Sequence, residues 1–215
     1  MKRPLDRGGL RFYLVLIALV RGAATPRTIA AGVPLLLLGA ALHLWAKGCL
    51  RQNRSVTRIG PYRFVRHPFY LANALIDAGI AVMSGWWVLQ AVLPAWWLTV
   101  YLPVMRSEED YLTRVFGSVH EDYRRRIPRL VPWRRPLPRT VEGFCWNNPN
   151  LTVDGAASRA LRLLAYPLLL LLCGRLRASG AALPADPIML AALVGLAAIY
   201  ALAWATKARK VFSVQ

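Results

Sequence analysis

The chain has 215 residues, of which 56% are hydrophobic and 18% charged. That apolar share exceeds the usual share of a soluble domain, and its concentration in long runs argues against a soluble globular core. The net charge of +18 does not indicate nucleic-acid binding, because the basic residues lie between apolar runs instead of on one compact domain.

Six apolar runs predict an all-α, polytopic membrane protein of about six transmembrane helices. The first run has basic residues before it and small residues after it, as in a secretory signal peptide, but Arg21 directly follows it and argues against cleavage. We therefore interpret it as a short transmembrane helix. The six runs are Leu10–Ala24, Thr28–Ala46, Phe69–Met83, Trp86–Met105, Leu161–Gly174 and Pro187–Thr206.

The connections divide the chain into four predicted parts. Residues 1–27 hold the short first helix, and residues 28–135 form a core of three spans with their polar motifs. Residues 136–157 form a Pro- and Asn-rich cytoplasmic loop, and residues 158–215 form a two-span extension. The stretch from 106 to 127 is polar, with helical spacing in its first half.

Charge predicts the orientation of the spans. With six spans, 24 of the 28 Lys and Arg fall on the side that holds both termini and the two long connections. Basic residues collect in cytoplasmic loops, so these connections are predicted to face the cytoplasm. The expected localisation is a cell or inner membrane, or an endomembrane, with the bilayer as the main partner.

Cysteine usage argues against a metal centre. The three cysteines are widely spaced, and the sequence has no CxxC pair or Cys/His cluster. Neither a disulfide framework nor a metal site is predicted.

The first polar motif is Gly60-Pro61-Tyr62-Arg63-Phe64-Val65-Arg66-His67-Pro68-Phe69-Tyr70, at the start of the third span. Proline suits the first turn of a helix, and a helix N-terminus favours an anion. Arg66 and His67 add cationic or donor groups there, so a carboxylate-bearing ligand fits this position. The alternative interpretation is that these side chains anchor the helix to phospholipid headgroups.

The second motif, Arg106-Ser107-Glu108-Glu109-Asp110-Tyr111-Leu112, follows the fourth span. The hairpin returns the chain to the side it left, so Glu108 and Glu109 are expected close to Arg66 and His67. Such acids suit ribose hydroxyls or an ammonium group. Alternatively, they pair with neighbouring arginines such as Arg106 or Arg114.

Together the two motifs resemble the isoprenylcysteine carboxyl methyltransferase and phospholipid methyltransferase superfamily. The family pattern has an RHPxY segment, a hairpin, EExxL, FG, a tyrosine and a closing V/I-P. In this chain the corresponding residues are Arg66-His67-Pro68-Phe69-Tyr70, Glu108 to Leu112, Phe116-Gly117, Tyr123 and Ile127-Pro128. The resemblance covers roughly half of the chain, and Ala72 stands where the family often has glycine.

The resemblance implies a membrane methyltransferase that binds S-adenosylmethionine between cytoplasmic loops and helix ends. Arg66 and Glu108 are the residues predicted to act in catalysis. The cofactor-binding residues that it implies are Tyr62, His67, Tyr70, Glu108, Glu109 and Leu112. The methyl acceptor is expected to be a lipid or a prenylated, isoprenylcysteine-like molecule, while a small hydrophobic acceptor and the oligomeric state stay open.

Two polar residues inside the third span are candidates for substrate binding. Asn73 and Asp77 are four residues apart and share one helix face. Ionisable groups inside a span are candidates for function by default. The alternative is a hydrogen bond to a neighbouring helix.

Two other functions compete with methyl transfer. An NADPH-dependent membrane lipid or sterol double-bond reductase has a related HPxY segment, although the paired glutamates, the FG and the closing Ile-Pro favour the methyltransferase. A non-catalytic lipid-binding or transport protein requires a polar path through the spans, for which only Asn73, Asp77 and Gln90 are available.

Overall fold

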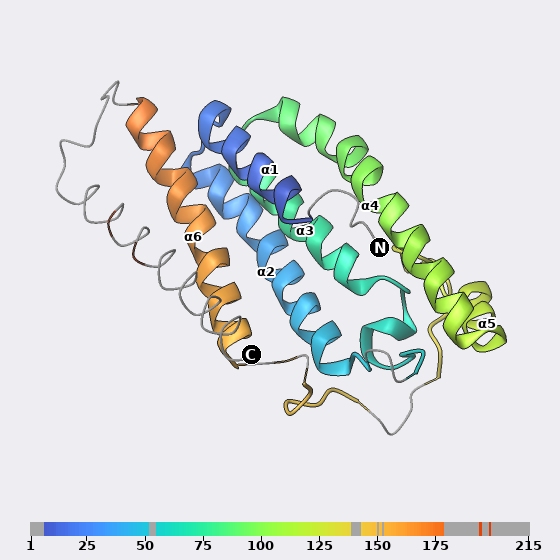
Figure 1. Cartoon of the computed structure of the whole chain (residues 1–215). Helices are drawn as coiled ribbons and strands as arrows, with labels where there is room; N and C mark the ends of the chain where they lie inside the picture. The colour runs from blue at the N-terminus through green and yellow to red at the C-terminus, as the bar shows by residue number, and fades with distance from the viewer. Residues whose placement is uncertain are drawn as a thin grey trace, which may run out of the picture. The chain divides into compact units, whose positions relative to one another are not determined.

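The computed structural model of the chain (Figure 1) describes residues 7–51, 55–138, 143–149, 151 and 153–178, with the isolated positions 194 and 198. Each secondary-structure element in these residues is a helix, in agreement with the all-α prediction. The elements are α1 (Arg7–Arg21), α2 (Pro26–Cys49), the 3₁₀ turn η1 (Gly60–Arg63), α3 (Pro68–Met83), α4 (Trp87–Phe116), α5 (Ser118–Arg126) and α6 (Val153–Ala178).

Two of these helices, α2 and α4, are long and apolar enough to cross a bilayer, with mean hydropathies of 1.9 and 1.5 over their best windows. The apolar stretches of α3 and of Ala165–Arg175 in α6 are shorter. The predicted span Pro187–Thr206 lies outside the described ranges, apart from positions 194 and 198. Six spans and their orientation therefore stay a prediction.

Two helix boundaries differ from those predicted from the sequence. Helix α4 does not end with the apolar run at Met105 but continues through the acidic motif to Phe116. Helix α6 begins at Val153, inside the predicted loop 136–157. The stretch from Ala156 to Leu161 is rich in alanine, which is the strongest helix former, and this favours the earlier start.

The chain forms two compact units, and helices α2, α3 and α4 each contribute residues to both of them. The first unit comprises residues 1–6, 38–76 and 94–152, and the second comprises residues 7–37, 77–93 and 153–215. In the second unit α1 packs against α6, and the N–H of Ala23 donates to the carbonyl of Ser84 at 2.7 Å. The division of the chain into four parts with different roles, predicted from the sequence, stays a prediction.

The first unit holds both polar motifs. Its apolar core includes a cluster formed by Ala46, Cys49, Ile59 and Tyr62, against which Phe69 and Phe144 pack. Between α4 and α5 the chain turns at Gly117, whose φ of 52° is in the left-handed region that glycine adopts without strain. This turn sends α5 back along the acidic end of α4.

Candidate active site

Backbone hydrogen bonds place the RHP segment beside the chain that follows α5. The N–H groups of Arg66 and His67 donate to the carbonyls of Pro128 and Arg129, at 2.9 and 3.1 Å. The hydroxyl of Tyr123, on α5, donates to the carbonyl of Tyr62 at 2.7 Å. These hydrogen bonds hold the start of α3 and the end of α5 together without any contribution from charged side chains.

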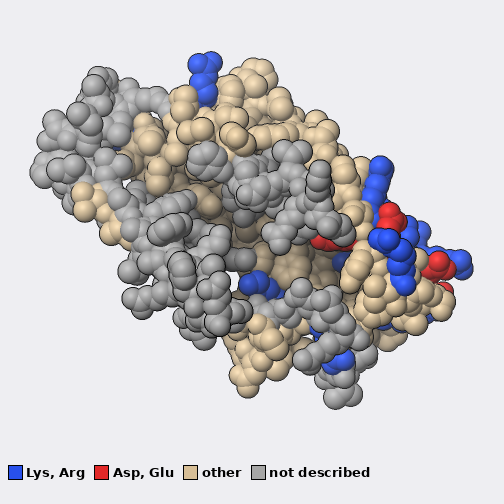
Figure 2. All heavy atoms as spheres, viewed as in Figure 1, with Lys and Arg blue, Asp and Glu red and all other residues tan. Residues whose placement is uncertain are grey.

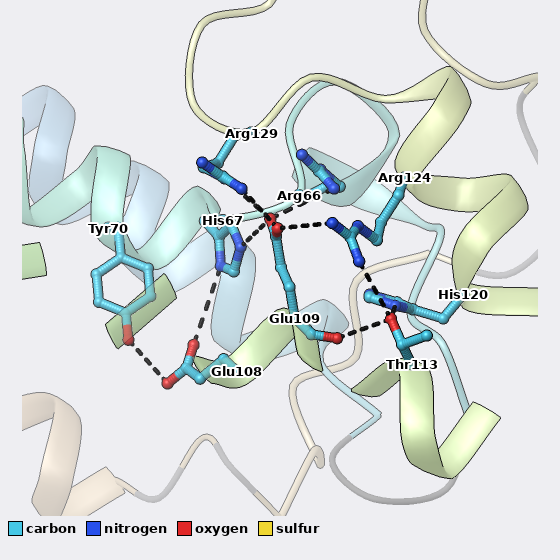
Figure 3. Close-up of polar contacts among 9 residues, drawn as sticks. All are labelled: Arg66, His67, Tyr70, Glu108, Glu109, Thr113, His120, Arg124 and Arg129. Atoms are coloured by element: carbon cyan, nitrogen blue, oxygen red, sulfur yellow. Dashed lines mark hydrogen bonds and ion pairs between the residues drawn. The ribbon is translucent and has the colours of Figure 1, made fainter. Parts of the chain in front are cut away.

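Glu109 lies at the centre of the site, with only 1% of its surface exposed (Figure 3). Arg129 donates to both of its carboxylate oxygens, at 3.1 Å from Nε and 2.7 Å from Nη2. Nε2 of His67 is 3.0 Å from Oε1, and Nη1 of Arg66 is 3.3 Å from the same oxygen. Arg124 approaches Oε2 at 3.8 Å. A single buried carboxylate thus holds four cationic or donor side chains from three segments of the chain.

These partners keep Glu109 ionised, at a point beyond the apolar part of α4. Burial on its own raises the pKa of this carboxyl, but hydrogen bonds from His67 and Arg129 and the charge of Arg66 outweigh it and hold the pKa well below its usual range. Because a carboxylate only accepts, Nε2 of His67 carries the proton in their hydrogen bond. Both oxygens of Glu109 are engaged by protein groups.

Glu108, the neighbouring residue, has a different environment. The hydroxyl of Tyr70 donates to its Oε1 at 2.8 Å, and Nδ1 of His67 is 3.9 Å from its Oε2. Its side chain is 38% exposed, against 2% for that of Glu109. His67 therefore lies between the two acids (Figure 3), and Glu108 is the one that a ligand can reach.

Aromatic side chains extend from this ion cluster along α4. The ring of Tyr70 is 5.5 Å from that of His67 and 5.4 Å from that of Tyr101, and Tyr101 in turn contacts Trp97 at 4.5 Å. All four side chains are at least nine-tenths buried. Rings of this kind present an electron-rich face that attracts a cation.

Tyr62 contributes a buried hydroxyl. The residue is 6% exposed, and its Oη has no hydrogen-bond partner among the described residues. Burial, and then the nearby Tyr123, Cys49 and Glu108, raise the pKa of Tyr62 well above its usual value, so the group stays a neutral donor. A buried donor left without a partner is unfavourable by about 1–3 kcal/mol, which a ligand acceptor would offset.

The structure thus brings together five of the residues predicted from the sequence, namely Arg66, His67, Tyr70, Glu108 and Glu109. The proximity of the second motif to the first, expected from the hairpin, is confirmed by the contacts of Glu109. Leu112 lies one turn beyond Glu108 on α4 and is half-buried. Asn73 is half-buried in the first unit and Asp77 is fully buried in the second, so their predicted substrate role stays a prediction.

Sequence reasoning missed Arg124 and Arg129. Arg106 and Arg114, the alternative partners of the acids, are both exposed, and the ion pairs of Glu109 run to residues further along the chain. The available signal was position: Arg124 opens the run of three arginines on α5, and Arg129 directly follows the Ile127-Pro128 motif. Figure 2 shows basic side chains gathered over α5.

Among the residues whose placement is described, no group of three or more His, Cys, Asp or Glu is arranged to hold a metal ion. The site consists instead of arginine, histidine, acid and aromatic side chains.

Comparison with known proteins finds one matching family and several similar proteins. Residues 28–119 match the family described as phospholipid methyltransferase. A nickel-cobalt-cadmium resistance protein of Alcaligenes xylosoxydans and a cobalt-zinc-cadmium resistance protein of Cupriavidus metallidurans are each 34% identical over 82 residues, which is 38% of this chain and 38% of each relative. Methanethiol S-methyltransferase 1 of Bradyrhizobium diazoefficiens is 35% identical over 77 residues, 35% of this chain and 26% of that protein.

The matched stretch therefore spans about two fifths, or less, of these relatives. No solved structure matches the chain.

Proposed function

We propose that this protein, whose residues 28–119 match the phospholipid methyltransferase family, transfers a methyl group from S-adenosylmethionine to a hydrophobic acceptor at a membrane. The observation that carries the proposal is the unequal environment of two adjacent acids. Glu109 is enclosed by cations and holds the site together, while Glu108 is partly exposed and held by Tyr70.

The side chains fit the parts of this cofactor. When bound, S-adenosylmethionine supplies an electrophilic methyl group on a positively charged sulfonium. Glu108 would accept hydrogen bonds from ribose hydroxyls or the ammonium group, and the unpartnered Tyr62 hydroxyl would donate one. The surplus of arginine around Glu109 favours the carboxylate end of the ligand.

The remaining chemistry is orientation and removal of a proton. Because the donor methyl is already activated, the protein has to align the acceptor and exclude water. A carboxylate acceptor has no proton to lose, whereas a thiol, an amine or a hydroxyl releases one. In that case Glu108, whose side chain is partly exposed, would accept the proton that the acceptor releases. Arg66, four residues before Tyr70, contacts Glu109 and orients the same segment.

We further propose that the acceptor is a lipid or a prenylated molecule that reaches the site from the bilayer. Exposing a fifteen-carbon chain to water costs on the order of 12 kcal/mol at about 0.8 kcal/mol per CH₂, so entry from the side avoids a large barrier. The long apolar helices α2 and α4 support a membrane location. The excess of Lys and Arg in the two long connections supports a site that faces the cytoplasm.

A small thiol is a second candidate acceptor, favoured by the similarity to two methanethiol S-methyltransferases. The two acceptors are distinguished by supplying radiolabelled S-adenosylmethionine with a total lipid extract or with methanethiol. Label in extracted lipid supports the first acceptor, and label in a volatile thioether supports the second.

The test of the cofactor is calorimetry on detergent-purified protein. We expect S-adenosylmethionine and S-adenosylhomocysteine to bind, and Glu108→Gln to weaken both. Asp110→Asn is the matched control, because Asp110 is an exposed acid two residues further along α4. Binding of NADPH without binding of either sulfur compound would contradict the proposal and favour the reductase.

A further inference from the structure

A second group of polar side chains lies where α5 folds back on α4, at the end of the segment that matches the family. It consists of Thr113 on α4 and of His120 and Arg124 on α5 (Figure 3). His120 is 2% exposed, and nothing in the proposed function uses it. Nδ1 of His120 is 2.9 Å from the hydroxyl oxygen of Thr113, which also receives Nη1 of Arg124 at 3.4 Å.

Counting protons assigns the donor in each of these bonds. The hydroxyl oxygen of Thr113 is 2.9 Å from the backbone carbonyl of Glu109, which can only accept. The single hydroxyl proton of Thr113 therefore goes to that carbonyl. Thr113 must then accept from both other neighbours, so His120 carries its proton on Nδ1 and has a lone pair on Nε2.

This arrangement determines where Arg124 points. With both of its lone pairs used, Thr113 holds Nη1 of Arg124 while Nη2 extends toward Glu109 at 3.8 Å. If His120 carried its proton on Nε2 instead, Nδ1 would be an acceptor facing an oxygen whose proton is already committed. The lone pairs of Nδ1 and of the Thr113 oxygen would then repel each other, and the contact between α4 and α5 that positions Arg124 would be lost.

We propose that His120 is a positioning residue, which acts as an Nδ1–H donor to hold Thr113 and thereby directs Arg124 to Glu109 in the cofactor site. The inference rests on the proposed function for its binding readout. It concerns a residue outside the matched segment 28–119.

The proposal has a consequence at low pH. Burial, and then the charge of Arg124, lower the pKa of His120, so the ring is neutral at pH 7. The charged groups that act on it are Arg124 on α5, Glu109 on α4, and Arg66 and His67 before α3. Protonation at Nε2 keeps the bond to Thr113 but adds a positive charge near those of Arg124 and Arg66. Because the pKa of His120 is lowered, cofactor affinity is expected to fall only at a pH below the usual histidine value of about 6.5.

The first experiment compares three substitutions by calorimetry with S-adenosylhomocysteine. His120→Asn places an amide N–H where Nδ1–H was and is expected to bind within about twofold of wild type. His120→Gln and His120→Leu remove that donor, and a lost hydrogen bond predicts a two- to tenfold weaker affinity. Rescue by Gln but not by Asn overturns the tautomer assignment, and equal binding by all three overturns the positioning role.

The second experiment measures the same affinity from pH 7.5 to 5.5. Wild type is expected to weaken at the acid end more than His120→Asn, and any loss common to both belongs to groups other than His120. Identical profiles overturn the expected effect of the added charge, while the positioning role of the Nδ1–H donor is decided by the three substitutions. If His120→Leu does not fold, Thr113→Ser and Thr113→Val form a substitute pair, in which only Ser keeps the hydroxyl and the affinity.

A third readout does not depend on the cofactor. The chain has three histidines, so ¹⁵N-histidine NMR of the purified protein gives a simple spectrum, in which His120 is assigned from His120→Asn. A protonated Nδ1 and an unprotonated Nε2 at pH 7.5 support the inference even if no sulfur compound binds, in which case the proposed function alone fails. The opposite tautomer overturns the inference whatever the binding result.

Discussion

Nε2 of His67 lies 3.0 Å from Oε1 of Glu109, although 42 residues separate them in sequence. The contact joins the start of α3 to the polar end of α4. Because Arg66, Arg124 and Arg129 meet the same carboxylate, it is one part of a buried network. Removing the acid leaves several cations without their counter-ion.

We therefore expect opposite effects from the two adjacent glutamates. Glu109→Gln should destabilise the protein by about 3–5 kcal/mol, the usual result of breaking a buried ion pair. Glu108→Gln should leave the unfolding temperature within a few degrees of wild type while it weakens cofactor binding. Thermal unfolding in detergent, beside calorimetry, separates the two, and equal unfolding temperatures for both variants would contradict the assigned roles.

The stability lost in Glu109→Gln should depend on pH. The pKa of Glu109 is lowered on folding, so its carboxylate stabilises the protein above the ordinary carboxyl value of about 4.3, and this contribution disappears as the pH falls toward the lowered value. The difference in unfolding temperature between wild type and Glu109→Gln should be constant from pH 8 to 5 and shrink below pH 4. A difference that grows with acid would contradict this linkage.

Tyr62→Phe removes a buried hydroxyl that has no partner among the described side chains and carbonyls. The variant should therefore fold as well as wild type or slightly better, and it should bind S-adenosylmethionine two- to tenfold more weakly. Tyr111→Phe is the control, because Tyr111 is 44% exposed on the same unit. Unchanged affinity together with lower stability would place the hydroxyl in the fold and not in the site.

Residues 143–149 are expected to support the site from its apolar side. The side-chain amide of Asn148 donates to the carbonyls of Gly48 and Leu50 at the end of α2, and Phe144 packs over Gly48. Asn148→Ala should cost about 1–2 kcal/mol of stability, against no change for its exposed neighbour in Asn147→Ala. Gly48→Ala should displace Phe144, because the added Cβ would lie 2.1 Å from its ring.

The orientation predicted from charge has a native probe. Cys145 is exposed, while Cys49 is buried. A membrane-impermeant maleimide should label Cys145 from the cytoplasmic side only, and Ala182→Cys in a Cys145→Ser background from the opposite side only. Labelling of Cys145 from outside would contradict the orientation.

The meeting of the two motifs was predictable because a hairpin returns the chain to the side it left, and Arg66, His67 and Glu109 show this. The contacts of Arg124 and Arg129 with Glu109 were not predictable. The polar stretch from 106 to 127 does not indicate the direction in which the chain continues after Gly117. The start of α6 was missed for a similar reason. Proline and asparagine before residue 150 extended the predicted loop over an alanine-rich segment that is helical.

The two backbone hydrogen bonds from Arg66 and His67 to Pro128 and Arg129 also bear on what counts as a minimal protein. The family match ends at residue 119, yet two arginines that neutralise the buried glutamate, and both carbonyls that receive these bonds, come later in the chain. A fragment that ends at residue 119 would keep the two motifs but lose the arginines and carbonyls that contact them. The similarity therefore ends before the site is complete, and a chimaera made with a relative should exchange the chain through at least Arg129 as one block.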